Sequence, residues 1–384
     1  MAKTITKRTL IGYNAWKVNV EYSSELVTSM KRSINEGLKN LKGVYKNVKF
    51  DVIIGNPPYQ EKDGGSGASA TPLYNLFVET SVRLSERYVS MITPSKWFAG
   101  GKGLDKYRDF MLNSSSLKVM VDIVNGKEIF PNTSIGGGVS YFLWDKKYNG
   151  LTQYTNQHDG VSNTQERKMN EFPVFVRYNE AISAIHKIGE HASVGDFVIS
   201  RNPFGLPTKI RGEEVRDSRN SIKVISSDGV GFVPLEDIIK GHELVGKYKV
   251  ISSRLTSEHS GEPNKNGMFK VISTNRVIKP NEVVTDSYLV LFSADTETEA
   301  INYLKYLRTR FYRFLLLQAV TSINLSKDKF IFIPVQNFTS GSDINWNVGI
   351  EEVDMQLFKK YSFDASEILF INQTIVPILH EEYY

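Results

Sequence analysis

Four consecutive residues, Asn56-Pro57-Pro58-Tyr59, carry the clearest chemical signal in the chain, directly after the apolar run FDVII. An exocyclic amine on a nucleobase is a poor nucleophile, because its lone pair is delocalised into the ring. Two acceptors that each take one N–H draw the nitrogen towards a pyramidal geometry and free that lone pair. The side-chain oxygen of Asn56 and the backbone carbonyl of Pro57 suit this task, since proline fixes φ and contributes no competing donor.

Tyr59 completes the motif, because its ring offers a flat face on which a base flipped out of a duplex can stack. The four residue types in this order therefore predict chemistry on an NH₂ group of a nucleobase, achieved mainly by positioning and electrostatics. The alternative interpretation is a turn that ends a strand and uses asparagine and proline for their conformation alone.

The elements around this motif alternate between short apolar runs and amphipathic segments, which predicts an α/β fold with a largely parallel sheet. Thr71 is expected to cap a helix that has Pro72 at its first position. The predicted strands are Phe50–Ile54, Tyr88–Ile92, Leu117–Val124 and Val139–Trp144, of which Phe50–Ile54 has the pattern of a short buried strand. The predicted helices are Thr71–Leu84 and Leu104–Leu112.

Two glycine-rich loops, Asp63–Ala70 and Ile135–Gly138, interrupt this half. The first follows the strand end at Ile54, where ligands bind in open α/β sheets, so it is either a lid or a solvent-exposed connection. The polar stretch Leu151–Arg167 is expected to form a hairpin or a linker that leads away from the sheet. Beyond Phe172 the pattern changes from alternating strands and helices to short strands, turns and a late helical stretch. This change predicts a catalytic domain over residues 1–175 and a second domain over residues 176–384.

The second half has short strands, turns and one late helical stretch, Ala300–Val320, with apolar residues on one face. The basic residues of this stretch are expected on the helix surface away from the apolar face. They are Lys305, Arg308, Arg310 and Arg313. Gly246–Lys279 contains seven Lys/Arg against two acids, a local excess of the kind that phosphate contacts require. A solvated basic face without a ligand is the alternative.

Composition bounds the remaining functional classes. Hydrophobic residues make up 41% of the 384 residues and charged residues 23%, as in ordinary globular proteins, and no apolar run is long enough for a membrane span. The chain has no cysteine, and its six histidines lack ligand spacing, so we expect no metal. The first residues lack the pattern of a signal peptide, which predicts a cytoplasmic protein.

The stretch FDVIIGNPPY resembles motif IV of the N6-adenine and N4-cytosine methyltransferases, in the gamma arrangement that places the target-recognition domain last. The chain is most similar to the Eco57I-like restriction-modification methylases of bacteria and phages, and the similarity covers nearly everything from residue 48 onward. It extends through the blocks TPLYNLFVETSVRL, SMITPSKWFAGGKGLDKYRDFML, GGGVSYFLWDKKYNG, SRNPFGLPT and SINLSKDKFIFIPVQ.

This resemblance implies a Rossmann-like methyltransferase sheet followed by an α+β domain that recognises the DNA target. It places Asn56 and Pro57 at the amine, with Pro58 between them and Tyr59, which lies on one face of the base. Phe130 falls where gamma-class adenine enzymes carry an aromatic for the other face, and a core phenylalanine is the alternative. Pro94-Ser95-Lys96-Trp97 is expected to line the cleft, with Lys96 a candidate for DNA contact.

The second domain supplies the remaining expected DNA contacts. Which of these residues reads a base edge and which a phosphate does not follow from the sequence. The candidates are Arg201, Asn202, Lys209, Arg211 and Arg254, together with Lys327 in the stretch Ser326–Lys329.

The chain departs from the family pattern in the segment that should bind S-adenosylmethionine. No glycine-rich loop occurs among the 55 residues before Asn56. Trp16–Val20 followed by Glu21 resembles the second strand, whose terminal acid holds the ribose hydroxyls, although a surface glutamate ahead of a helix fits equally. The Rossmann-like sheet is therefore expected to be incomplete at its N-terminus.

We therefore predict a site-specific DNA methyltransferase that transfers a methyl group from S-adenosylmethionine to adenine N6, within or derived from a restriction-modification system. A second polypeptide could supply the cofactor motif, and a restriction subunit is another possible partner. The alternative from another class is an inactive relative that binds DNA or a partner without methylating. Methylation of cytosine N4, RNA or protein is a third option.

Overall fold

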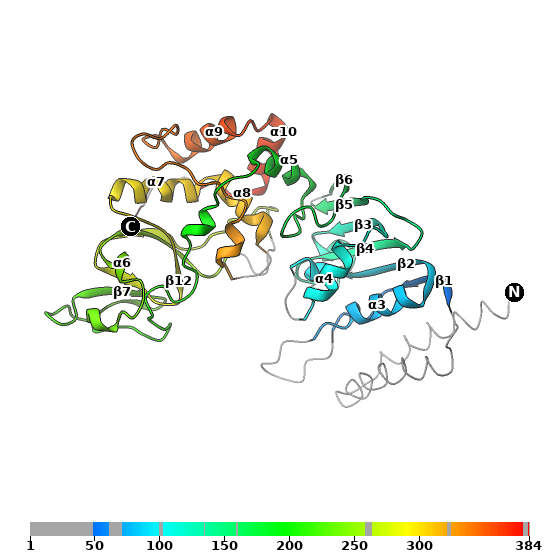
Figure 1. Ribbon diagram of the computed structural model, residues 1–384, viewed down its shortest axis with the longest axis horizontal. Helices are drawn as coiled ribbons and strands as arrows, with labels where there is room; N and C mark the ends of the chain where they lie inside the picture. The colour runs from blue at the N-terminus through cyan, green and yellow to red at the C-terminus, as the bar shows by residue number, and fades with distance from the viewer. Residues whose placement is uncertain are drawn as a thin grey trace, which may run out of the picture. The chain divides into compact units, whose positions relative to one another are not determined.

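The computed structural model describes residues 49–378 and Tyr383, except residues 61–70, 100–102, 134, 159, 258–262 and 321–323. The chain divides into two compact units, Met1–Pro173 and Val174–Tyr384 (Figure 1). This division lies two residues from the predicted domain boundary. The predicted segment around Glu21 lies outside the described residues.

Unit 1 contains a six-stranded mixed sheet with the order β1-β2-β4-β3-β5-β6. Strands β1 and β2 are parallel, as are β3 and β5, while β4 runs antiparallel to both of its neighbours and β6 runs antiparallel to β5. It follows that β1, β2, β3 and β5 all point the same way. The strands are β1 (Phe50–Gly55), β2 (Ser85–Pro94), β3 (Leu117–Ile123), β4 (Val139–Asp145), β5 (Thr152–His158) and β6 (Val161–Arg167).

The predicted strands and helices of unit 1 all exist, with shifted ends. Helix α3 covers Tyr74–Leu84, so Thr71 and Pro72 precede it, and Leu73 at its N-cap makes no side-chain cap. Helix α4 covers Asp105–Leu112. Both helices lie over the same face of the sheet, because Phe110 of α4 stacks on Trp144 of β4 and Tyr107 of α4 contacts Tyr74 of α3.

Two expectations for this sheet were wrong. The run Phe50–Ile54 is a strand but not a buried one, since Val52 is 50% exposed and Ile54 77%. The stretch Leu151–Arg167 does not lead away from the sheet: β5 pairs with β3, and β6 pairs with β5, so this hairpin extends it. Polar side chains are tolerated there because β6 is largely solvent-exposed.

Unit 2 is an α+β unit with two three-stranded sheets among its described residues, β10-β9-β12 and β11-β7-β8. One apolar core joins both sheets and includes Phe204, Val224 and Ile251. The strands are β7 (Ile222–Ser226), β8 (Gly229–Val233), β9 (Tyr248–Ser253), β10 (Asn275–Ile278), β11 (Glu282–Val284) and β12 (Tyr288–Ala294); the helices are α5 (Asn179–Ile188), α6 (His242–Val245), α7 (Glu297–Arg308), α8 (Arg310–Ala319), α9 (Ile350–Lys360) and α10 (Ala365–Thr374).

The predicted single helix Ala300–Val320 is in fact two helices separated at Thr309. This residue ends α7 and caps α8: its hydroxyl accepts the N–H of Tyr312 and donates to the carbonyl of Tyr306. The buried carboxylate of Asp354 accepts the first two N–H groups of α8, from Arg310 and Phe311, both at 2.8 Å. A tertiary carboxylate thus stabilises a helix start that periodicity alone could not reveal.

The basic residues of this region are also not on a solvent face. Arg313 is 0% exposed and donates to the carbonyls of Arg308, Thr309, Lys270 and Val376. Lys305 donates to two further carbonyls, and Arg308 to Asn275. These cations satisfy buried chain ends, which explains their spacing without a nucleic acid.

Candidate functional site

The ends of four parallel strands define one edge of the sheet in unit 1. Asn56 follows β1, Ser95 follows β2, and the turn Gly126–Glu128 comes shortly after β3. Val139 begins β4 between Pro94 and Ile123, which brings the glycine-rich loop before it to the same edge. In open α/β sheets this carboxyl edge is where ligands bind.

The predicted amine-binding residues form an extended segment at this edge. Asn56 is half-buried, and its carboxamide makes no hydrogen bond with any residue that the structure describes. Pro57 is buried, and the Tyr59 carbonyl accepts the N–H of Leu73 at 3.2 Å. A bridge between Gln60 and Pro72 closes the base of the predicted lid loop. The carboxamide of Asn56 is therefore available to a ligand. Backbone contacts of Tyr59 and Gln60 with Leu73 and Pro72 fix the other end of this segment.

Tyr59 and Phe130 lie next to each other, as the two predicted stacking residues should. Their ring centroids are 6.4 Å apart, but the interplanar angle of 80° makes the contact edge-to-face. No parallel slot for a base exists between the rings in this arrangement. The Tyr59 hydroxyl is buried without a hydrogen-bond partner, and burial raises the pKa of this phenol to about 12. The hydroxyl is therefore a neutral donor without an acceptor.

A tight turn after β3 positions Phe130. The carboxamide of Asn125 accepts the N–H of Lys127, and the N–H groups of Ile129 and Phe130 donate to the carbonyl of Gly126. A Cβ on Gly126 would lie 3.3 Å from atoms of Ile135, so the two turns of this edge pack closely at a glycine. This packing fixes the backbone from which the Phe130 ring projects.

A row of buried polar residues crosses the sheet just behind the edge. Thr93, Ser140, Asp122 and Asn156 are register partners on neighbouring strands, and each is 0% exposed. Asp122 accepts the hydroxyl of Ser95 at 2.7 Å, which fixes the start of the helical turn after β2. Asp122 was not among the site residues predicted from the sequence, although an acid inside the apolar run LKVMVDIV was a usable signal.

The residues after β2 divide between surface and core. Lys96 is exposed and forms no ion pair with a described residue, while a Cβ on Gly137 would touch its side chain at 3.5 Å. Trp97 is 1% exposed and packs on Phe98 and Tyr107. The expectation that Trp97 lines the cleft was therefore wrong, since it belongs to the core under α4.

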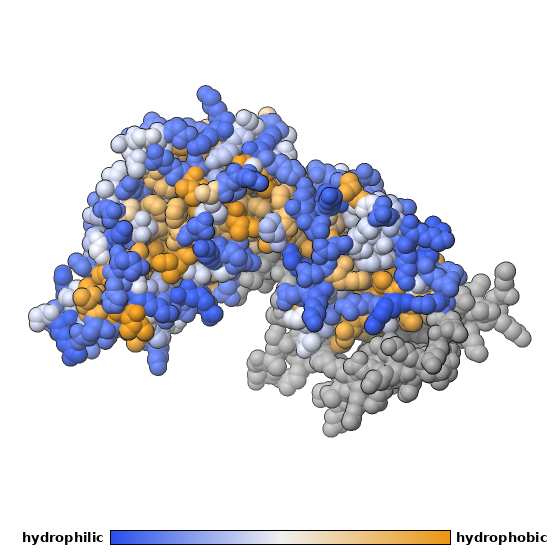
Figure 2. Space-filling model, viewed as in Figure 1, coloured by the Kyte–Doolittle hydropathy of each residue, from blue (hydrophilic) through white to orange (hydrophobic). Residues whose placement is uncertain are grey.

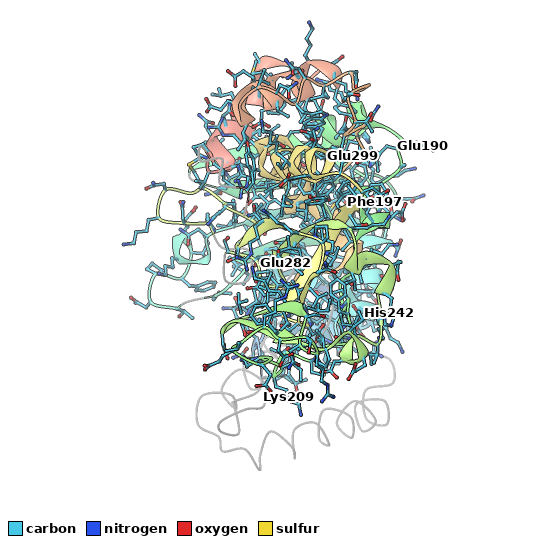
Figure 3. All side chains as sticks on the ribbon, turned by 90° about the vertical axis from the view of Figure 1, so that its left-hand side faces the viewer. Glu190, Phe197, Lys209, His242, Glu282 and Glu299 are labelled. Atoms are coloured by element: carbon cyan, nitrogen blue, oxygen red, sulfur yellow. The ribbon has the colours of Figure 1, made fainter. Side chains whose placement is uncertain are left out.

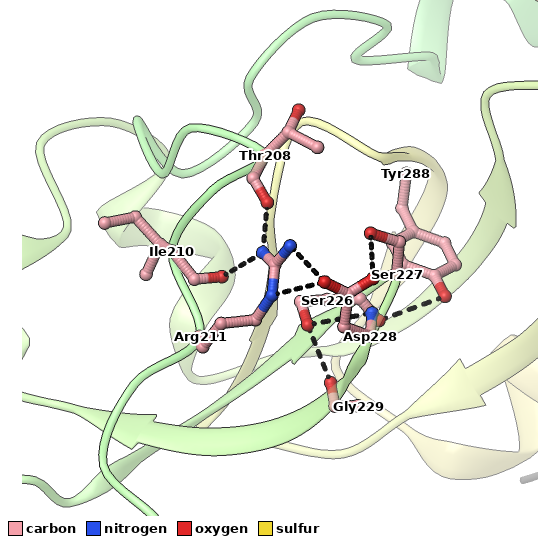
Figure 4. A network of polar contacts seen from close by, with 8 residues as sticks. All are labelled: Thr208, Ile210, Arg211, Ser226, Ser227, Asp228, Gly229 and Tyr288. Carbon is pink, nitrogen blue, oxygen red and sulfur yellow. Dashed lines mark hydrogen bonds and ion pairs between the residues drawn. The ribbon is translucent and has the colours of Figure 1, made fainter.

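Arg211 of unit 2 is held by its own loop (Figure 4). Its Nε donates to Asp228 at 2.8 Å, its Nη2 pairs with the same carboxylate, and its Nη1 donates to the carbonyls of Thr208 and Ile210. Arginine offers five N–H donors, and this network engages three of its nitrogens. The guanidinium of Arg211 therefore stabilises the conformation of its own loop.

Arg254 is similarly engaged by Asp286. Its Nη1 lies 2.9 Å from Asp286 Oδ2 and also donates to the Asp286 carbonyl. The other carboxylate oxygen accepts the N–H of Asn202 at 2.5 Å, and Asn202 has a positive φ of 46°. Asp286 thereby fixes the turn Asn202–Gly205, whose Gly205 has no room for a side chain because Ile239 lies 2.1 Å from the position of a Cβ.

Arg201 and Lys209 differ from these two arginines. Both are exposed and make no hydrogen bond or ion pair with a described residue. Lys209 projects from the end of unit 2 opposite α9 and α10 (Figure 3). In the same unit Val230, Leu235 and Ile239 are 51%, 51% and 68% exposed. Figure 2 shows a hydrophobic patch bordered by hydrophilic residues at this end of the unit.

Lys327 lies in a hollow of mixed charge. Its Nζ is 3.4 Å from Asp196, and Ser200 and Asp328 line the same hollow. Asp328 is paired with Lys329. Two carboxylates offset the two lysines here, so the stretch Ser326–Lys329 does not form a locally cationic surface for a phosphate.

The basic tract Gly246–Lys279 is also not a free cationic surface. Lys249 is 0% exposed, and its Nζ donates to the carbonyls of Leu244, Val245, Lys247 and Lys279 at 2.7–3.3 Å. Lys247 pairs with Asp295, and Arg254 pairs with Asp286. Lys247, Lys249 and Arg254, three of the seven cations of the tract, are therefore engaged within the fold, and a phosphate footprint over the rest of the tract stays a prediction.

Among the described residues, no group of three or more histidines or acids is arranged to hold a metal ion. Nor does this part of the chain contain a helix with the length and apolarity needed to cross a bilayer.

Sequence comparison finds relatives for the N-terminal part of the chain. Residues 1–130 match the family model described as Eco57I restriction-modification methylase. A curated protein of Mycoplasma pneumoniae (strain ATCC 29342 / M129 / Subtype 1), described as an uncharacterized adenine-specific methylase, is 37% identical over 110 residues. The match covers 27% of this chain and only 26% of that protein.

Solved structures show weaker likeness. The type IIG restriction endonuclease BpuSI is 11% identical with a TM-score of 0.36, over 83% of this chain and 50% of its own. The type IIL restriction-modification enzyme MmeI in complex with DNA is 9% identical with a TM-score of 0.43, over 84% and 56%. TM-scores of this size establish neither a shared activity nor a shared partner.

Proposed function

We propose that the chain acts on DNA as an adenine-N6 methyltransferase, and the match of residues 1–130 to the family model described as Eco57I restriction-modification methylase supports this proposal. The observation that carries the proposal is the carboxamide of Asn56 at the carboxyl edge of the sheet, which has no hydrogen-bond partner among the described residues, with Tyr59 and Phe130 in contact with each other nearby. The Rossmann-like α/β arrangement of unit 1 provides that edge.

Asn56 and Pro57 act on the amine of an extruded adenine. The Asn56 side-chain oxygen accepts one N–H of the amine, and the Pro57 carbonyl accepts the other. These hydrogen bonds strengthen as the nitrogen becomes pyramidal, so they stabilise the transition state more than the ground state.

Tyr59 and Phe130 hold the base. Because their rings now meet edge-to-face, one ring must turn before a base can stack between them. An edge-to-face pair contributes only about 0.5–1.5 kcal/mol beyond its burial, which base stacking of about 1–3 kcal/mol can replace. The pair therefore closes the empty site and opens when a base enters.

The DNA contacts are assigned to the unpaired cations. Lys96 in unit 1 and Arg201 and Lys209 in unit 2 make no hydrogen bond or ion pair with the part of the chain that the structure describes, so their donors can bind phosphates or base edges. Arg211, Arg254 and Lys327 act indirectly, because carboxylates of the same unit already bind them. Unit 2 is thus the target-recognition domain in this proposal, with double-stranded DNA as its partner.

The described residues alone do not form a site for S-adenosylmethionine, the methyl donor of this family. At the sheet edge, Asp122 is bound to Ser95 and Tyr154, and Glu128 is bound to Gln157. Neither carboxylate is available for the ribose hydroxyls of the donor. Glu21, outside the described residues, or a second polypeptide remains the proposed source of that contact, and we derive no step that involves the donor.

A second function is DNA binding without methylation. It is favoured by the lack of a site for S-adenosylmethionine among the described residues. An amine-binding motif without a donor site would still recognise an extruded base. A restriction-modification complex that supplies the donor site from another subunit would restore the reaction.

The experiment that tests the proposal is identification of the product. Purified chain is incubated with S-adenosylmethionine and duplex DNA containing all possible short sites, and the digested nucleosides are separated by mass spectrometry. N6-methyladenine should appear, Asn56→Ala should abolish it, and the matched control Asn149→Ala, at an exposed turn, should not. DNA binding without any methylated nucleoside would refute autonomous methylation and support the second function.

A further inference from the structure

One face of the sheet in unit 1 is apolar but open among the described residues. Residues directly opposite each other in the register point to the same side. The face that α3 and α4 cover includes Val89, Met91 and Phe142, which are 0%, 6% and 2% exposed. On the other face, which we call the open face, Val52, Ile54 and Tyr141 are 50%, 77% and 43% exposed.

The apolar character of the open face is graded across the sheet. Ile92 of β2, Leu143 of β4 and Val121 of β3 lie on it and are only half-buried. Towards β5 and β6 the same face carries polar residues, including Thr155 and its partner Thr164. A segment that covers the apolar part of the open face would therefore pack on β1, β2, β4 and β3, and not on the β5–β6 hairpin.

Although the sheet is mixed, its strands β1, β2 and β3 run in the same direction and are joined by crossover helices, and a sheet connected in this way is normally covered by helices on both faces. Both described crossover helices of unit 1 lie on the other face. Exposed β-branched residues on an edge strand such as β1 are moreover a liability that proteins usually cover. The open face therefore requires an occupant.

The chain carries a matching segment directly before β1. Apolar residues recur at helical spacing from Val27 to Leu41, a pattern of one stripe with polar residues opposite. The stripe consists of Val27, Met30, Ile34, Leu38 and Leu41. These residues lie outside the described part, and residue 48 joins directly to Lys49 at the start of β1, whose Val52 and Ile54 are the most exposed members of the open face.

We propose that residues 27–41 pack as an amphipathic helix across the open face, with the stripe against Val52, Ile54 and Tyr141. The short connection to β1 makes an intramolecular contact far more favourable than capture of another molecule. This inference concerns the fold of unit 1 and stands whether or not the chain methylates DNA.

The absence of cysteine from the whole chain allows a clean disulfide test. Ile54→Cys, at a position that is 77% exposed, is combined with one further cysteine at Met30, Ile34 or Leu38 on the stripe. Matched controls place the second cysteine at Arg32 or Lys39, on the opposite side of the predicted helix. Under mild oxidation, at least one stripe pair should form a disulfide within a monomer at least tenfold faster than either control pair.

Equal rates for stripe and control pairs would overturn the proposal, since they indicate no fixed packing. Disulfide-linked dimers as the main product would also overturn it, because a second copy would then occupy the face. Hydrogen exchange gives an independent measurement: Val52→Asp with Ile54→Asp should increase exchange in residues 27–41, whereas Leu76→Asp on α3 should not. Unchanged exchange in the double variant would contradict the assignment.

Discussion

The buried Lys249 predicts a specific dependence of stability on pH. Burial lowers the pKa of this ammonium group from 10.5 to about 8 in the folded chain. The unfolded chain therefore binds more protons than the folded chain between those values, and the free energy of unfolding rises with pH through this window. The charged form is what burial penalises, so the cost is full below pH 8 and is relieved towards pH 10.5.

The size of the effect follows from the shift. A shift of one pKa unit corresponds to about 1.36 kcal/mol, so the two protonation states differ by about 3 kcal/mol, of which about 2 kcal/mol is recovered between pH 7 and pH 9.5. Lys249→Met removes the titrating group. Urea unfolding of both proteins at the two pH values should therefore show a gain for the wild type that the variant lacks.

Other groups titrate in this range, and the difference between the two proteins cancels them. Buried tyrosines such as Tyr59, whose pKa is raised to about 12, lower stability only above the unfolded value of 10. If wild type and Lys249→Met change in parallel from pH 7 to pH 9.5, Lys249 is not a buried cation, and the interpretation of the basic tract as part of the fold fails.

Three further predictions concern the site and unit 2. Phe130→Ala should weaken retention of an extruded base by about 1–3 kcal/mol, read from 2-aminopurine fluorescence at the target, whereas Phe130→Tyr should keep it; equal signals would exclude stacking. Lys209→Ala should reduce the slope of log affinity for DNA against log salt concentration by about 0.9. Arg211→Ala, in the same loop, should lower the melting temperature and leave that slope unchanged. A reduced slope for Arg211→Ala with an unchanged slope for Lys209→Ala would refute the assignment. Asp354→Ala should destabilise the chain by about 1–3 kcal/mol in urea unfolding, because the N–H groups of Arg310 and Phe311 lose their acceptor, and Asp354→Asn should cost less; a neutral Asp354→Ala would disprove the cap.

Local patterns were sufficient to predict four of the six described strands of unit 1 and its helices α3 and α4. Alternating apolar runs and amphipathic segments gave β2, β3, β4, α3 and α4 within a few residues, because these elements bury one side of a regular period. The motif Asn56–Tyr59 follows a strand as predicted, and the structure places Phe130 in contact with Tyr59, while their role in stacking a base stays a prediction. Their edge-to-face orientation was beyond the sequence, since side-chain torsions depend on the surrounding packing.

The failures came from charge. Lys249, Lys305 and Arg313 look like solvent-facing cations in the sequence, but each donates to several carbonyls at buried chain ends. Some of these acceptors, such as the carbonyl of Lys279 for Lys249 and that of Val376 for Arg313, lie 30 and 63 residues away, so local periodicity does not reveal them. Arg211 and Arg254 illustrate the same limit, since their carboxylate partners Asp228 and Asp286 are 17 and 32 residues away.

The break at Thr309 has a related cause. Apolar residues continue at helical spacing on both sides of it, and threonine alone does not end a helix. The separation depends on Asp354 of α9, which accepts the N–H groups that a continuous helix would have paired internally.

A structure of the chain bound to DNA that carries one extruded adenine tests the central claim most directly. The account predicts that the adenine N6 nitrogen lies about 2.7–3.2 Å from both the side-chain oxygen of Asn56 and the carbonyl oxygen of Pro57, with the base between Tyr59 and Phe130. An adenine whose amine faces away from both oxygens, or a duplex bound with every base still stacked, would contradict it.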